Sequence, residues 1–149
     1  VAAGFGLTVG YHNHEQEFVA SFGGQTAYER FIELTDDRVE IELDLFWAIA
    51  GGQDAPALVK ALGSRLVAVH VKDGIAPKSN PWAPGAEAFA SASLDQRHAG
   101  TAEVPLAASL KAGEGAIKYA VIEYDNAPGD VFEDIKASYA FLTEGGFVA

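Results

Sequence analysis

Four segments of the chain alternate apolar and polar residues, the pattern typical of β-strands that bury one face. These segments are residues 6–13, 39–44, 65–72 and 117–124. In the third segment, three valines at alternate positions occupy one face and His70 occupies the other. The pattern therefore predicts four strands with one apolar face each.

Apolar residues at helical spacing follow each predicted strand, over residues 26–34, 54–63, 105–111 and 130–142. The second of these helices has Asp54 as N-cap, Pro56 in its first turn and Gly63 as its end. The apolar faces of the first and last helices are predicted at Ala27, Phe31 and Leu34, and at Phe132, Ile135, Tyr139 and Leu142. Because strands and helices alternate four times, we expect an α/β fold with a parallel sheet.

A segment rich in proline and small residues, 75–103, separates the third strand from the helix that follows it. It contains Pro77, Pro81, Trp82 and Pro84, which indicate a long loop. Loops of this length in compact domains are usually lids or binding loops. We therefore expect such a role here.

Composition and charge narrow the choice of partners. The 149 residues are 49% hydrophobic, as in a single globular domain, and 10 Lys and Arg against 21 Asp and Glu give a net charge of −11. This charge argues against binding nucleic acid or an anionic membrane surface. Cysteine is absent, so thiolate chemistry is excluded. No apolar run of roughly 20 residues or signal-peptide pattern occurs, and we expect a cytoplasmic protein.

Ionisable side chains gather where each predicted strand ends. They are His12 and His14, Asp44, His70 and Lys72, and Glu123 and Asp125. They lie on one face of their strands, while Val9, Ile41, Val69 and Ile122 lie on the other. If the apolar face packs on the helices, the ionisable face points into a shared interior, at the strand ends where parallel barrels carry active sites. Two imidazoles and two carboxylates suit a divalent metal ion.

Several of these residues also have simpler interpretations. His12 and His70 can be buried core histidines, and Asp44 can be a helix N-cap. Glu42 fits best as a polar residue on the barrel floor. Trp47 either stacks against a sugar or packs beneath a loop, and Arg97 and His98 either contact an anion or lie in a solvated loop.

Four motifs in order resemble the sugar phosphate isomerase/epimerase family of xylose isomerase-like TIM barrels. They are GYHNHEQEF at 10–18, ELDLFWA at 42–48, VHVKDG at 69–74 and VIEYDN at 121–126. The resemblance spans nearly the whole chain and implies a metal ion held by one residue from each strand, here His12, Asp44, His70 and Glu123. The family more commonly has Glu at the position of His12.

The family fold is a (β/α)₈ barrel of about 250 residues, and residues 1–149 match only its last four β/α units, as a single incomplete domain. Half of a barrel would leave two sheet edges and an apolar interior exposed. We therefore expect an N-terminal half outside this sequence, or a second chain that closes the barrel. The lack of any methionine agrees with the first expectation, and a homo-oligomer is one form of the second.

The resemblance implies a metal-dependent isomerase or epimerase that acts on a sugar, sugar phosphate or keto-sugar through an enediolate. Mn²⁺ is the expected ion, ahead of Co²⁺, Mg²⁺ and Zn²⁺. Glu123 is the expected base, with Lys72, His12 or His14 returning the proton, and the expected substrate contacts are His14, Trp47, Lys72 and Arg97. Two alternatives remain: a lyase of the inosose dehydratase or keto-sugar type, and a non-catalytic sugar-binding subunit.

Overall fold

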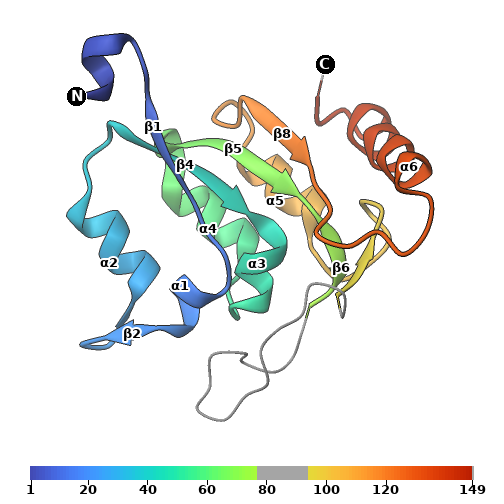
Figure 1. The fold of residues 1–149 in the computed structure, drawn as a ribbon, viewed down its shortest axis with the longest axis horizontal. Coiled ribbons are helices and arrows are strands. Elements are labelled where there is room, and N and C mark those ends of the chain that lie inside the picture. Colours follow the sequence, from blue (N-terminus) through green and yellow to red (C-terminus); the bar gives the residue numbers. More distant parts are fainter. Residues whose placement is uncertain (77–93, 149) are drawn as a thin grey trace.

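A parallel sheet forms the centre of the protein (Figure 1). The structure is a computed structural model that describes residues 1–76 and 94–148. The sheet has four strands in the order β1 (Val9–His12), β4 (Val39–Asp44), β5 (Leu66–Val71) and β8 (Tyr119–Ile122). All three neighbouring pairs are parallel, as the sequence predicts.

A helix follows each of these strands and completes four β/α units. The helices are α2 (Ala27–Leu34), α4 (Ala55–Leu62), α5 (Leu106–Ala112) and α6 (Val131–Glu144). Their bounds agree closely with the predicted segments, and Asp54 caps α4 by accepting a hydrogen bond from the Ala57 amide. Even α6, the longest described helix, has 14 residues. No helix in the described part of the chain has the length and apolar character needed to cross a membrane.

Short elements that the pattern does not predict lie between these units. They are two 3₁₀ turns (Ala2–Phe5 and Gly63–Arg65), helices α1 (Gln16–Val19) and α3 (Leu45–Ala50), and strands β2 (Ser21–Phe22), β3 (Gln25–Thr26), β6 (Asp73–Ile75) and β7 (Asp95–Arg97). Most are too short to show a period. The expected long loop is therefore partly wrong, because β6 and β7 pair antiparallel at its two ends. Residues 77–93, with Pro77, Pro81, Trp82 and Pro84, lie outside the described residues.

The hydrophobic core lies between the sheet and the helices that pack on it. Ile41, Leu43 and Val69 are completely buried there, which confirms the predicted helix-facing side of the central strands. Val9, predicted on the same side of β1, is half exposed because β1 is an edge strand of the described sheet. Gly51, at the end of α3, packs so closely on Phe18 that a Cβ would lie 2.6 Å from that side chain.

Two predicted helix faces are wrong in detail. In α2 the buried anchor is Tyr28, which packs on Phe18 of α1, and Leu34 is exposed. In α6 the buried residues are Ser138 and Leu142, whereas the other predicted apolar positions, Phe132, Ile135 and Tyr139, are exposed. Helix α6 lies at one end of the sheet, and it packs mainly on β8 (Figure 1). Its apolar stripe is therefore not covered by the described elements.

Candidate metal centre

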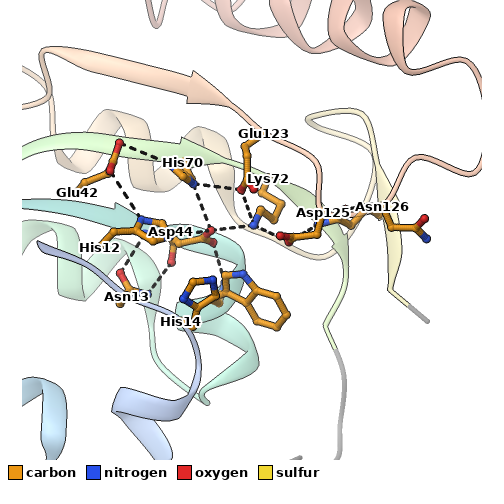
Figure 2. A network of polar contacts seen from close by, with 12 residues as sticks. His12, Asn13, His14, Glu42, Asp44, His70, Lys72, Glu123, Asp125 and Asn126 are labelled. Carbon is orange, nitrogen blue, oxygen red and sulfur yellow. Dashed lines mark hydrogen bonds and ion pairs between the residues drawn. The ribbon is translucent and has the colours of Figure 1, made fainter. Parts of the chain in front are cut away.

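Asp44 lies at the end of β4 and has no exposed surface. Its Oδ1 atom accepts a hydrogen bond from the Trp47 amide at 2.9 Å and so caps α3. Asn13 holds the backbone of Asp44 through two further hydrogen bonds, of 3.0 and 3.3 Å. The N-cap interpretation is thus correct for one carboxylate oxygen, and Oδ2 remains directed at the ionisable residues of the neighbouring strands (Figure 2).

The two predicted histidines both lie close to this oxygen. His12 Nε2 is 3.9 Å and His70 Nδ1 is 3.5 Å from Asp44 Oδ2, and the two imidazole centroids are 4.2 Å apart. Parallel pairing produces this arrangement, because Asp44 is the register partner of His70. One ligand atom from each of the three residues lies within 4.8 Å of the other two. Three of the four predicted metal ligands are therefore brought together.

Glu123, the fourth predicted ligand, contacts its neighbours rather than joining this group. Its Oε2 atom is 3.1 Å from His70 Nδ1 and 2.5 Å from Lys72 Nζ. The Lys72 ammonium is almost fully buried and also lies 3.0 Å from Asp44 Oδ2 and 2.7 Å from Asp125 Oδ2. One buried cation thus links three carboxylates, as Figure 2 shows.

Comparison with known proteins identifies the fold. No protein-family model and no curated protein matches the sequence. The chain is similar to two sugar phosphate isomerase/epimerase structures from Parabacteroides distasonis, with 24% and 21% identity, TM-scores of 0.70 and 0.66, and coverage of 99% and 94% of this chain. A xylose isomerase domain protein from Planctomyces limnophilus is 19% identical, with a TM-score of 0.64 over 97% of this chain. The chain spans 48%, 46% and 46% of the length of these three structures. It has the fold of half of a xylose isomerase-like TIM barrel.

Within this half-barrel the ionisable cluster occupies the carboxyl ends of the four parallel strands. Barrels of this type carry their active sites at that end, because the loops and strand ends there surround one cavity. The cluster therefore lies at the end of the sheet where the predicted fold class places it.

Contacts within the cluster shift the pKa values of neighbouring side chains in opposite directions. Burial opposes charge on His70, but contacts with Asp44 and Glu123 outweigh it and raise the His70 pKa to about 9. Burial and the nearby His70 lower the pKa of His12. Contact with His70 and Lys72 outweighs burial and lowers the Glu123 pKa to about 2. The Lys72 pKa is raised by Asp44, Asp125 and Glu123 in spite of burial.

The donor set fits a divalent ion. Two imidazole nitrogens and a carboxylate oxygen are ligands that Zn²⁺, Co²⁺ and Mn²⁺ accept. Hydrogen bonds fix the backbone and the Oδ1 atom of Asp44, so that Oδ2, which also contacts Lys72 Nζ, faces the two imidazoles. His12, Asp44 and His70 would hold the ion, and Glu123, whose Oε2 atom lies 3.1 Å from His70 Nδ1, stays the predicted fourth ligand.

Gln96 of β7 contacts the cluster and Asp73 of β6 holds the segment that follows β7, and no local sequence pattern predicts either role. Gln96 donates a hydrogen bond to Asp125 Oδ2 at 3.0 Å and accepts one from the Asn126 amide at 2.6 Å. Asp73 is buried, and its two oxygens accept hydrogen bonds from the amides of Gly74, Gly100, Thr101, Ala102 and Val104. These contacts depend on the pairing of β6 with β7, the two strands at the ends of the segment predicted as a long loop.

The remaining predicted substrate contacts differ in position. Trp47 lies at the cluster, with Lys72 Nζ 5.4 Å from its ring centroid, but it is buried in the core, as the packing interpretation has it. His14 is exposed and its ring lies against both His12 and Trp47. Arg97 is not brought into the cluster: among the described residues its ion pair is with Asp95, and its side chain is 48% exposed. A substrate contact by Arg97 or by His98 stays a prediction.

Proposed function

We propose that the protein is a divalent-metal-dependent isomerase or epimerase that acts on a sugar, sugar phosphate or keto-sugar through an enediolate. The observation that carries this proposal is the convergence of His12, Asp44 and His70 at the carboxyl ends of adjacent parallel strands, within 4.8 Å of one another. The names of the structures with the same fold support the substrate class. Mn²⁺ is the ion we propose.

A bound divalent ion would polarise the substrate carbonyl and stabilise the negative charge of the enediolate. The proton transfers fall to this chain. Glu123 is a carboxylate at neutral pH and can accept the proton from the carbon next to the carbonyl, once it leaves Lys72. Lys72 is an ammonium at neutral pH and can return a proton. Positioned acids and bases of this kind typically contribute about 10²- to 10⁴-fold in rate.

Two of the predicted substrate contacts lie beside the cluster. Trp47 lies beside Lys72 but is only 5% exposed, so its ring packs in the core next to the cluster rather than offering an open surface to a sugar. His14 is exposed at the same place and is available to a substrate hydroxyl.

We also propose that a second half-barrel covers the open edges and the inner face of the sheet. Tyr119 and Val121 of β8 point to the same side as Glu123, and both are exposed. Exposed apolar surface of this kind normally belongs to an interface. The second half would come from the same polypeptide or from another chain, including a second copy of this one.

The experiment has two parts. Metal analysis of the purified protein should find about one divalent ion per cluster after incubation with Mn²⁺. Incubation with candidate keto-sugars in D₂O should then place deuterium in a recovered isomer. An unsaturated or deoxy product would instead support the lyase, and a protein that takes up no ion would support a sugar-binding subunit.

A further inference from the structure

Glu42 lies on β4, two residues before Asp44, and next to both imidazoles. Its position in the sequence predicts a polar residue of the barrel floor. In the structure its Oε1 atom is 3.3 Å from His70 Nε2, and its Oε2 atom is 3.9 Å from His12 Nδ1 (Figure 2). The two oxygens of one carboxylate thus face two different imidazoles.

The nitrogens that Glu42 faces are those turned away from Asp44. His70 directs Nδ1 at Asp44 Oδ2 and Nε2 at Glu42, whereas His12 directs Nε2 at Asp44 and Nδ1 at Glu42. His12 Nδ1 is buried and forms no hydrogen bond within the described part of the chain. A small rotation of the Glu42 carboxylate, which is about one third exposed, would bring an acceptor to it.

A histidine that binds a metal through one nitrogen must carry its proton on the other. An acceptor at that second nitrogen fixes the tautomer and the orientation of the ring. We infer that Glu42 is a positioning residue that orients both His12 and His70, so that His12 Nε2 and His70 Nδ1 are presented together to a divalent cation. This inference rests on the proposed function, because it concerns the same centre.

Glu40 provides a matched control. It lies two residues earlier on the same face of β4, and its side chain is 34% exposed against 36% for Glu42. Its Oε1 atom lies 3.9 Å from Lys118 Nζ. Glu40→Gln therefore removes the same charge from the same face without changing the contacts of the histidines.

The test measures Zn²⁺ affinity of the whole protein by calorimetry for the wild type, Glu42→Gln and Glu40→Gln. Loss of such an outer contact typically costs about 10- to 100-fold in metal affinity, and we expect this for Glu42→Gln, with no loss for Glu40→Gln. The loss should persist at about 0.5 M salt, where the effect of a distant charge is screened. Circular dichroism checks that both variants fold.

NMR of the Zn²⁺-loaded wild type adds a readout that needs no variant. The ring protons on His70 Nε2 and His12 Nδ1 should be protected from exchange, and in Glu42→Gln at least one of the two signals should shift or disappear. Equal Zn²⁺ affinities for wild type and Glu42→Gln would overturn the inference alone. A wild type that binds no Zn²⁺, Mn²⁺ or Co²⁺ would overturn the proposed function and this inference with it.

Discussion

The central and edge strands of the sheet have similar sequences but different surroundings. In β4 and β5, residues such as Ile41, Leu43 and Val69 are completely buried. In the edge strands, 51% of Val9 and 66% of Tyr119 are exposed. Alternation of apolar and polar residues therefore predicts a strand, but it does not predict whether that strand has a neighbour on both sides.

The residues of the candidate metal centre likewise come from both the central and the edge strands. Asp44 and His70 come from the buried central strands, where packing fixes the backbone on both sides. His12 is the last residue of the edge strand β1, and Glu123 directly follows the other edge strand, β8. We expect the central pair to set the position of the centre and the edge pair to depend on whatever covers the edges.

Among the changes to the central pair, Asp44→Ala should have the largest effect on stability and metal binding. This change removes the cap of α3 and leaves the buried Lys72 ammonium with one carboxylate fewer, at an expected cost of about 3 kcal/mol in free energy of unfolding. It should also abolish stoichiometric metal binding. Urea denaturation and calorimetry measure the two effects.

Asp54→Ala is the matched control for this change. Asp54 caps α4 through the same kind of hydrogen bond, but its side chain is exposed and lies outside the cluster. Its loss should cost about 1 kcal/mol and leave metal binding unchanged. If Asp44→Ala retained full metal affinity, Asp44 would be a helix cap only.

A second pair of variants compares the packing of centre and edge directly. Leu43→Ala empties a completely buried site in β4 and should lower the free energy of unfolding by about 2–5 kcal/mol. Val121→Ala, in β8, should cost less than about 1 kcal/mol in this 149-residue chain, because 37% of the side chain is exposed. Equal costs in urea denaturation would mean that β8 is already covered in solution, for example by a second copy of the chain.

The pKa values of the two histidines should depart from the ordinary value of 6.5 in opposite directions. His70 has its pKa raised to about 9, whereas the pKa of His12 is lowered. In the metal-free protein, the stabilisation from His70 is complete below pH 6.5 and is lost as pH rises through 9. The contribution of His12 is present above pH 6.5 and is lost as pH falls through its lowered pKa. NMR titration of the two rings measures both; coinciding pKa values would contradict this difference.

Much of the fold follows from the sequence because it depends on local periodicity. The strand that ends at Asp44 and the helix that begins after Asp54 appear as predicted. The stripe on α6 with Phe132 and Tyr139 is different, because no element among the described residues covers it. Periodicity identifies an apolar face but does not identify its partner.

The candidate site follows from strand parity only in part. Parity places His12, Asp44 and His70 on one face, and parallel register brings them together. Glu42 shares that parity, but its role depends on which imidazole nitrogens it faces. The contact between Gln96 and Asp125 joins residues 29 positions apart through a pairing of short strands that no local pattern predicts.

The most direct test of the central claim is a crystal structure of the protein soaked with Mn²⁺ and measured at wavelengths where manganese scatters anomalously. We expect one strong anomalous peak at the carboxyl ends of β1, β4 and β5, about 2.0–2.3 Å from His12 Nε2, Asp44 Oδ2 and His70 Nδ1. Absence of a peak at this position, or imidazoles of His12 and His70 turned away from Asp44, would contradict the account.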